Sequence, residues 1–427
     1  MKKTKLTTWI FYGMLAGIAV GWADHQFMEP GMAKTTASYI SLVTDIFLRL
    51  IKMIIAPLVF STLVVGIAHM GDSKTIGRVG IKALAWFIVA SLCSLLLGMA
   101  LVNALQPGVG LNLPLPEAGA SSSLKTSSMS LKEFVTHLVP RSAFEAMANN
   151  EILQIVVFSV FFGVAAGSFG PKAKTVIDAV EELSHIMLKV TLYVMALAPV
   201  AVFAAMAAVV TTQGLGVLWT YGKFMGEFYL GIVLLWVLLA FAGFLFIGPR
   251  IWRLISLIRE PILLAFSTAS SEAAYPKTLE QLERFGASKK ITSFVLPLGY
   301  SFNLDGSMMY CTFAVLFIAQ AYGINLDLGQ QITMLLILMV TSKGMAGVPR
   351  ASLVIIAATL VQFNIPEAGL LLILGIDQFL DMGRSATNVV GNSVATAVVA
   401  KWEGELEPEA QAQAEIDADE GIAPARA

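Results

Sequence analysis

Residues 374–406 have the sequence LGIDQFLDMGRSATNVVGNSVATAVVAKWEGEL, an apolar segment interrupted at regular intervals by charged and amide side chains. Five polar residues recur at spacings of four, three, four and four: Asp377, Asp381, Arg384, Asn388 and Asn392. At about 100° per residue of an α-helix, these side chains fall within an arc of about 80°. The spacing therefore predicts a helix with one polar face and an apolar remainder.

The composition of the whole chain indicates a membrane protein. Hydrophobic residues make up 57% of the 427 residues and charged residues 13%, whereas a soluble domain has about 45–50% and about 25%. The mean hydropathy is +0.76. The 28 basic and 29 acidic residues nearly cancel, so no basic excess is present to bind nucleic acid. These values exclude an ordinary soluble enzyme and make the lipid bilayer the expected partner.

Six apolar segments in the first 250 residues approach the length of about 20 residues that a transmembrane helix needs. They are 7–23, 40–68, 81–105, 152–167, 188–212 and 224–247. Lys and Arg gather before the first segment and in every second connection after it. The positive-inside rule then places the N-terminus and the region after residue 250 in the cytoplasm. We expect a multi-pass protein of the inner cell membrane with both termini cytoplasmic.

These features divide the chain into five parts. Residues 1–105 hold helices 1–3, residues 106–150 form an exposed loop rich in Ser, Pro and Gly, and residues 151–248 hold helices 4–6. Residues 249–400 form the part that carries the chemistry. Residues 401–427 contain ten charged residues, eight of them acidic, and this composition predicts a disordered cytoplasmic tail.

Small polar residues break two apolar stretches, 263–276 and 332–360, where a lipid-facing helix would not tolerate them. Irregular backbone at membrane depth is stable only where protein or a water-filled cavity satisfies its N–H and C=O groups. Each stretch therefore predicts a re-entrant hairpin, and each is followed by a helix with polar residues in its apolar body. Two such units entering from opposite faces form an inverted repeat with a binding site at the midplane of the bilayer.

The polar face of 377–392 has two interpretations. An ionised side chain at bilayer depth costs roughly 2.5–3.5 kcal/mol on insertion scales, so these charges must pair with one another or with a substrate. In the structural interpretation, Asp377 or Asp381 simply satisfies Arg384. In the functional interpretation, Arg384 binds a carboxylate bidentately and Asp381 accepts from an ammonium group, which together describe a zwitterion with an extra acid.

The sequence NLDG at 303–306 lies in the middle of the apolar span 291–322. A glycine there can open the helix and free carbonyl groups beside the carboxylate of Asp305. Hard oxygen ligands of this kind suit a monovalent cation. The alternative is a kink stabilised by Asn303 and Asp305 as caps.

Four segments resemble the dicarboxylate/amino acid:cation symporter family, which has the glutamate transporter fold. They are AFSTASSEAAYP (265–276), PLGYSFNLDGSMMY (297–310), TSKGMAGVPRASLV (341–354) and the segment 374–406. The resemblance covers nearly the whole membrane chain, including 48–68. It implies an all-α polytopic membrane protein with eight transmembrane helices and two re-entrant hairpins. It also implies inverted repeats, a homotrimer built on a scaffold domain, and a transport domain that moves like an elevator.

The resemblance also implies roles for residues of the substrate site. Arg384 would bind the side-chain carboxylate of the substrate, Asp381 its amino group, and Asp377 would orient Arg384. The α-carboxylate and its surroundings would be held by further residues: Asn388, Ser270, Ser271, Ser307, Gly347 and Val348. Dicarboxylate carriers of the family usually have a small polar residue at the position of Asp381. We therefore expect glutamate or aspartate as substrate, with a C4-dicarboxylate as the alternative.

The same resemblance implies a coupling cation, either a proton or sodium, and no other cofactor. Cation or proton ligands would come from Asp305, Asn303, Gly299, Ser301, Ser342, Met345, Asn392, Ser91 and Glu272. A sodium ion would lie among Asp305, Asn303, Gly299, Asn388 and Asn392. Sodium-coupled members tend to have aspartate at the position of Asn392 and threonine at that of Ala90. Proton-coupled members resemble this chain at Glu272, so we expect proton coupling in preference to sodium.

Arg350 follows Pro349 at the tip of the second predicted hairpin, where the family usually has small residues. We expect Arg350 to supply a gating charge that pairs with Glu272 or Asp381; its alternative is a solvent-facing arginine. An enzyme is not expected, because the four histidines lie outside the hairpin region and form no HExxH pattern. Cys93 and Cys311 share no metal-ligand spacing, and the chain lacks the GxxxxGK[ST] motif of ATP-driven transport.

Overall fold

The computed structural model describes residues 6–70, 73–109, 136, 139–215, 221–342, 351–374 and 376–408. Within these ranges every regular element is a helix, apart from one isolated antiparallel bridge between Ala287 and Leu406. The expected all-α chain of apolar helices is thus confirmed. The count of eight transmembrane helices, the re-entrant hairpins and the elevator stay predictions.

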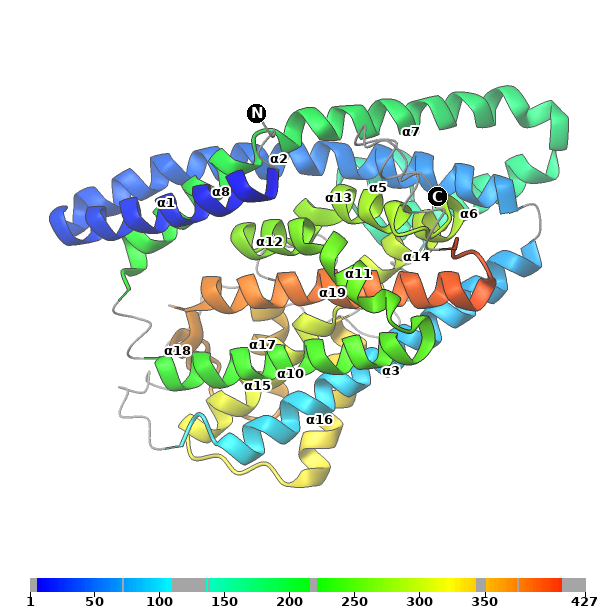
Figure 1. Cartoon of the computed structure of the whole chain (residues 1–427). Helices are drawn as coiled ribbons and strands as arrows, with labels where there is room; N and C mark the ends of the chain where they lie inside the picture. Colours follow the sequence, from blue (N-terminus) through cyan, green and yellow to red (C-terminus); the bar gives the residue numbers. More distant parts are fainter. Residues whose placement is uncertain are drawn as a thin grey trace.

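Five helices form an upper layer that spans the width of the molecule (Figure 1). They are α1 (Leu6–Phe27), α2 (Pro30–Met70), α6 (Ile152–Ser168), α7 (Lys174–Met195) and α8 (Ala198–Gln213). Helices α1 and α8 pack closely because Gly13, Gly17 and Gly21 form one face of α1. A side chain at any of these glycines would overlap a backbone carbonyl of α8, so small residues permit the close approach.

One predicted membrane segment, 188–212, is not a straight helix. Helices α7 and α8 meet at an angle of 49°, with a turn at residues 196–197 and Pro199 in the first turn of α8. Proline is tolerated there because a backbone N–H in the first turn of a helix has no acceptor within the helix, so its absence costs no hydrogen bond. The segment is therefore divided between two helices that meet at a bend, and its count as one membrane span stays a prediction.

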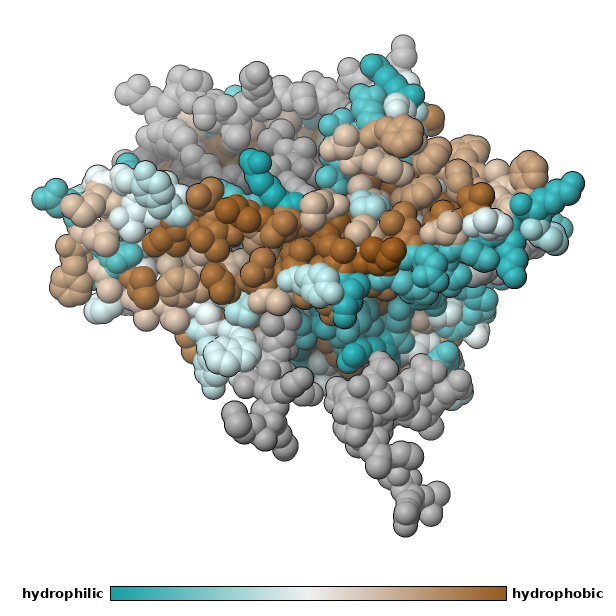
Figure 2. Space-filling model, turned by 90° about the horizontal axis from the view of Figure 1, so that it is seen from above, coloured by the Kyte–Doolittle hydropathy of each residue, from teal (hydrophilic) through white to brown (hydrophobic). Residues whose placement is uncertain are grey.

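The outer surface of the upper layer is apolar. Figure 2 shows apolar side chains gathered in a band across this face, with hydrophilic side chains beside it. Exposed apolar residues include Leu42, Ile46 and Met53 of α2, Val200 of α8, and Leu197 in the turn before α8. By length and composition, three helical stretches in the described residues are long and apolar enough to cross a membrane, at 74–105, 222–247 and 289–321, and the bent pair α7–α8 is a fourth if it counts as one span. Such surfaces are expected of a protein whose solvent is lipid.

A second group of helices packs beneath this layer around α19 (Figure 1). Its long members are α3 (Ser73–Leu105), α10 (Gly222–Ile247), α14 (Lys289–Phe302), α15 (Asp305–Ala321) and α19 (Asp377–Glu403). Helix α19 contacts the other four. Apart from Gln378 and Arg384, its residues from Asp377 to Ala400 are buried. The polar face predicted from the sequence therefore lies in the interior and not against lipid.

Shorter helices occupy the two stretches predicted as hairpins. Helices α12 (Arg259–Thr268) and α13 (Ser271–Arg284) pack against each other and against α19. Between them, Ala269 adopts a left-handed conformation with φ of 51°. The second stretch contains α16 (Leu328–Thr341) and α17 (Ala351–Gln362), and its central residues 343–350 lie outside the described residues. The remaining helices are α5 (Ala143–Ala148), α11 (Arg250–Leu257) and α18 (Leu370–Leu374).

The apolar span 291–322 is broken, as NLDG predicts, but its glycine is not the cause. Helix α14 ends at Phe302 and α15 begins at Asp305, so the irregular residues are Asn303 and Leu304. Gly306 is helical, and a side chain on it would overlap the carbonyl oxygen of Arg384. This glycine therefore permits close packing of α15 on α19, while the break precedes it.

Two boundaries differ from those expected. The loop predicted over 106–150 includes the short helix α5, whose N-cap Ser142 accepts a hydrogen bond from the backbone N–H of Glu145. The tail predicted from residue 401 begins in an ordered segment, because α19 continues to Glu403 and the chain up to residue 408 is described. Composition predicted disorder there because it does not reveal which acidic residues have basic partners.

Candidate functional site

The buried pair Asp381 and Arg384 forms the centre of the polar face of α19. Both nitrogens of one edge of the guanidinium donate to the carboxylate: Nε to Oδ1, and Nη2 to Oδ2 at 3.0 Å. The side chains are only 9% and 14% exposed. Residues three apart on a helix are neighbours, so α19 alone brings these charges together. Paired in this way, they avoid the cost of isolated buried charges.

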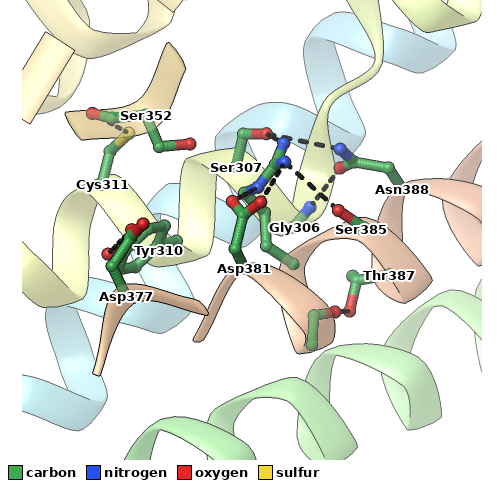
Figure 3. A network of polar contacts seen from close by, with 12 residues as sticks. Gly306, Ser307, Tyr310, Cys311, Ser352, Asp377, Asp381, Ser385, Thr387 and Asn388 are labelled. Carbon is green, nitrogen blue, oxygen red and sulfur yellow. Dashed lines mark hydrogen bonds and ion pairs between the residues drawn. The ribbon is translucent and has the colours of Figure 1, made fainter. Parts of the chain in front are cut away.

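The second edge of the guanidinium contacts hydroxyl groups. Nη1 of Arg384 donates to Ser307 Oγ at 3.2 Å, and Nη2 donates to Ser385 Oγ at the same distance. Ser307 belongs to α15, so the site joins two helices, as Figure 3 shows for the labelled residues around it. Ser307 was predicted from the sequence, whereas Ser385 was not.

Asn388, expected to hold a substrate carboxylate, links α19 to the start of α15. Its Oδ1 accepts from the backbone N–H of Gly306 at 2.9 Å, and its Nδ2 donates to Ser307 Oγ at 3.3 Å. Ser307 thus receives hydrogen bonds from Arg384 and from Asn388 together. A ligand oxygen entering here would take the place of the Ser307 hydroxyl as their shared acceptor.

Asp377 lies at the first position of α19, and its Oδ1 accepts a hydrogen bond from the hydroxyl of Tyr310 at 2.7 Å (Figure 3). The resemblance implied that Asp377 orients Arg384. The structure adds a partner for that carboxylate on α15, while Arg384 receives its contacts from Asp381, Ser307 and Ser385. The orienting role of Asp377 stays a prediction. Tyr310 was not singled out from the sequence, although its place in the same motif as Asp305 was visible.

A second polar cluster lies where the α14–α15 break meets α19. Gly391 faces Asp305 and Asn303, because a side chain at Gly391 would overlap Asp305 Oδ2 and lie 3.3 Å from Asn303 Nδ2. Gly299 of α14 likewise faces Asn392. Four residues predicted as cation ligands are thus neighbours in space, namely Gly299, Asn303, Asp305 and Asn392, and Gly391, which was not predicted, lies among them. We call them the cation cluster: Gly299, Asn303, Asp305, Gly391 and Asn392.

The cation cluster and Ser301, two residues before Asn303, contain buried side-chain oxygens that no donor among the described residues satisfies. Among the described residues, the side-chain oxygens of Asn303, Asn392 and Ser301 are buried without a hydrogen-bond partner. An unsatisfied buried polar group costs about 1–3 kcal/mol, so an arrangement of several calls for a ligand. Hard oxygen donors suit an alkali or alkaline-earth cation. No group of three or more His, Cys, Asp or Glu side chains suited to a metal ion occurs in the described residues.

Helix α3 covers the cation cluster from one side. Ser94 Oγ donates to the backbone carbonyl of Asp305 at 2.6 Å, and Ser91, predicted as a ligand, is fully buried one turn earlier. Phe87 lies near Gly299, and Ala90 is buried close by in sequence. Ser94 was missed from the sequence, although its spacing of three from Ser91 places both serines on one helical face.

The predicted residues of the first hairpin lie at the start of α13, which packs against α19. Ser270 is the N-cap of α13 and accepts from the backbone N–H of Ala273 at 3.3 Å. Ser271 is buried, and Glu272 is half-buried in the first turn of α13. Within the described part of the chain, neither serine bonds the pair.

The predicted residues of the second hairpin lie mostly outside the described residues. These are Met345, Gly347, Val348 and Arg350. Ser342 is described; it is buried and its hydroxyl donates to the carbonyl of Met339 at 3.2 Å. Helix α17 approaches the site through Ser352, whose carbonyl lies 4.0 Å from the sulfur of Cys311 (Figure 3).

Comparison with known proteins gives independent information on the class of protein. Residues 6–402 match the sodium:dicarboxylate symporter family. The chain is 41% identical over 415 residues to a proton/sodium-glutamate symport protein of Geobacillus stearothermophilus, an alignment that covers 96% of this chain and 97% of that protein. It is 38% identical over 417 residues to a protein of the same name from Bacillus subtilis, covering 96% and 95% of the two chains.

A relative named for a different substrate is equally similar. The C4-dicarboxylate transport protein of Laribacter hongkongensis is 41% identical over 413 residues, covering 95% of this chain and 92% of that protein. Overall identity therefore does not distinguish the two substrate classes, and the distinction depends on individual residues of the site.

Proposed function

Since the chain belongs to the sodium:dicarboxylate symporter family, we propose that it imports an acidic amino acid, glutamate or aspartate, together with a cation. It is a cation-coupled membrane symporter of a small molecule. The proposal concerns the identity of the substrate and of the coupling ion, the roles of individual residues, and the mechanism.

The observation that carries the proposal is the buried ion pair between Asp381 and Arg384. A substrate can enter only by replacing their mutual contact. An acidic amino acid does so without leaving a charge unpaired, because its side-chain carboxylate binds Arg384 while its ammonium group binds Asp381. A plain dicarboxylate would satisfy Arg384 and leave Asp381 ionised beside a second anion, which is costly in a buried site.

Import of a C4-dicarboxylate is the second candidate. It is favoured by the relative of Laribacter hongkongensis, which matches this chain as well as the glutamate symporter does. Arg384, Ser307 and Asn388 would serve either substrate, because each provides hydrogen-bond donors to a carboxylate. Asp381 is the residue on which the two candidates differ.

We propose proton coupling in preference to sodium, with Glu272 as the carrier. The sequence differs from sodium-coupled members at Asn392 and Ala90, so a full set of sodium ligands is not expected. The buried oxygens of Asn303, Asn392 and Ser301 support a partial cation site around Asp305. Sodium would bind at this cluster, whereas a proton would bind a carboxylate. Arg350, outside the described residues, is proposed to close the site as a gating charge.

We also propose that transport uses an elevator mechanism in a homotrimer. The separation of the α1–α2–α7–α8 layer from the helices around α19 supports a scaffold and a moving domain (Figure 1). In this scheme there are eight transmembrane helices, and α12–α13 and α16–α17 are re-entrant hairpins. Both termini face the cytoplasm across the inner membrane.

The deciding experiment is uptake into proteoliposomes of labelled glutamate, aspartate and succinate. Sodium and proton gradients are imposed separately, with choline as the inert cation. Uptake of either amino acid driven by an inward proton gradient supports the proposal. Succinate uptake without amino acid uptake would establish the second candidate, and uptake that requires sodium at every pH would exclude proton coupling.

A further inference from the structure

The end of α19 and the residues that follow it form ordered contacts with α3 and with the α13–α14 turn, and the proposed function does not use these contacts. At the end of α19, Glu403 binds two basic residues of α3. Its carboxylate lies 2.7 Å from Arg78 Nη2 and 2.7 Å from Lys82 Nζ, and its own side chain is 2% exposed. The hydrogen bond from Arg78 holds the pKa of Glu403 below its usual range, with a further contribution from Lys82.

The residues that follow Glu403 attach to the turn between α13 and α14. The backbone N–H of Ser288 donates to the carbonyl of Glu405 at 3.0 Å, and that of Glu407 donates to Gly286 at 2.9 Å. Lys290 and Glu405 form an ion pair. We call residues 402–407 the C-terminal clasp, because they bind α3 on one side and the α13–α14 turn on the other.

An aromatic cluster closes the clasp against α3 and α10. The ring of Trp402 packs edge-on against Trp86 of α3 at 5.8 Å and against Phe246 of α10 at 5.2 Å. Lys82 Nζ also donates to the carbonyl of Trp402 at 3.1 Å. Two carboxylate contacts, one backbone contact and one ring contact therefore connect α3 to the end of α19.

Helices α3 and α19 run in opposite directions between the clasp and the cation cluster. Arg78, near the start of α3, meets the end of α19, whereas Ser94 of α3 meets Asp305, which itself faces Gly391. At 1.5 Å per residue, the clasp and the cluster are about 20 Å apart along both helices. Attachment at both places fixes the sliding register of one helix against the other.

We propose that Glu403 is a positioning residue for the cation cluster: it holds α3 in the register that keeps Ser94 against Asp305 and Ser91 buried one turn earlier. This inference rests on the proposed cation-coupled function. Glu403 does not touch the ion. Without its charge, Arg78 and Lys82 lose their shared partner, α3 gains freedom to slide or tilt, and the serines leave their positions. Groups that orient direct ligands typically change ion affinity by about 10–100-fold when they are removed.

The test compares Glu403→Gln with wild type in proteoliposomes. Uptake is titrated with Na⁺ at fixed pH, and separately with protons at fixed choline concentration, always at saturating substrate. We expect the half-saturating cation concentration to rise about tenfold. The KM for substrate, measured at saturating cation, stays within about twofold of wild type, because the Asp381–Arg384 pair is not touched. Glu403→Asp restores most of the cation affinity.

Glu280→Gln is the matched control. Glu280 also pairs with two basic residues, Lys277 and Arg284, but all three belong to α13. Removing its charge therefore does not loosen α3 against α19. Its cation titration is expected to match wild type. If Glu403→Gln does not accumulate, Arg78→Gln, which leaves the Lys82 pair intact, decides the question through a smaller rise in the half-saturating concentration.

Two outcomes separate the clasp from the function on which it rests. If neither a sodium nor a proton gradient drives uptake by the wild type, the proposed function is wrong, and the inference that rests on it is excluded as well. If a gradient drives wild-type uptake and the variant titrates like wild type, the role of the clasp alone is excluded. Equal losses of cation and substrate affinity would likewise overturn it, because they indicate general loosening.

Discussion

Asp381 and Arg384 lie one turn apart on α19 and neutralise each other, so both groups proposed to bind substrate are already occupied. Their contact is bidentate, and hydroxyls of Ser307 and Ser385 complete the shell of the guanidinium. Under the proposed function, substrate binding is therefore an exchange of partners. Because a buried charge left alone is expensive, the exchange selects ligands that offer a partner to each member of the pair.

Asp381→Ser should change the preferred substrate. Without the carboxylate, the ammonium group of glutamate or aspartate loses its partner, and affinity for the amino acids should fall about 100-fold, or about 2.7 kcal/mol. Succinate should gain affinity, since the anion that repels its second carboxylate is gone. Competition of unlabelled substrates against labelled glutamate measures both effects.

Asp178→Asn, a loss of charge at an exposed position of α7, serves as the control and should leave both affinities unchanged. Unaltered glutamate affinity in Asp381→Ser would show that this carboxylate only neutralises Arg384. That result would restore the structural interpretation of the pair.

Gly391→Ala should damage the cation cluster while leaving the Asp381–Arg384 pair in place. The added Cβ would overlap Asp305 Oδ2, so the carboxylate must move away from α19. We expect the half-saturating cation concentration to rise about tenfold or more. Gly226→Ala in α10, where a Cβ meets nothing within 4 Å, is the matched control and should behave as wild type. Equal titrations of the two variants would contradict the placement of Asp305.

Much of the α19 site followed from spacing, because residues three and four apart on a helix share a face whatever the rest of the fold does. The pairing of Arg384 with Asp381 is local in this sense. The cluster of Asn303 with Asn392 joins residues far apart in the chain, and only the resemblance to a family suggested it. Ser385 and Ser94 went unnoticed because a serine in an apolar helix carries no charge that must be explained.

The errors have physical causes as well. Hydropathy does not distinguish one straight helix from two that meet at Pro199, so the span 188–212 was drawn too simply. Gly306 was assigned to the break in NLDG because glycine often opens helices, yet its role is close packing against Arg384. Acidic residues after Lys401 suggested disorder, since the basic partners of Glu403 lie more than 300 residues away in the chain.

Gly17→Ala should destabilise the upper layer without altering substrate binding. Its Cβ would overlap the carbonyl oxygen of Phe203 in α8, and overpacking of this kind typically costs about 1–3 kcal/mol. Thermal unfolding in detergent measures the loss. Gly31→Ala, with open space around the added Cβ, should be neutral or slightly stabilising. A KM for substrate that changes as much as the stability would argue against the separation of the two groups of helices.

Glu283 should make stability depend on pH. It lies at the end of α13 next to Arg284, beyond the apolar part of the hairpin, and burial raises its pKa from 4.5 to about 7, although Lys289 opposes the rise. The folded state therefore binds this proton more tightly than the unfolded state does. The resulting stabilisation is complete below about pH 4.5 and is lost as the pH rises through about 7.

Thermal unfolding between pH 5 and pH 8, about the range of that loss, tests this point. Wild type should unfold at lower temperature at the higher pH, and Glu283→Gln should flatten the dependence. Glu182→Gln, at an exposed position of α7, should keep the wild-type slope. The same slope in Glu283→Gln would assign the pH dependence to another group.

Asn392→Asp should convert the cation cluster into a stronger sodium site. In the described residues, both polar atoms of the Asn392 side chain are buried without a hydrogen-bond partner, and the side chain lies against Gly299 of α14. A carboxylate there adds a second negative charge to the cluster of Asp305. Two carboxylates this close cannot both stay ionised without a cation between them. Sodium binding and the ordered arrangement of these side chains therefore become linked. We expect uptake to become strongly stimulated by an inward sodium gradient, with a half-saturating sodium concentration lowered by about tenfold or more.

Asn364→Asp, on an exposed turn, makes the same chemical change outside the cluster and should leave the cation dependence as it was. If Asn392→Asp instead loses transport at every sodium concentration and responds only to protons, the new carboxylate is protonated, and the cluster is then a proton site and not a weakened sodium site.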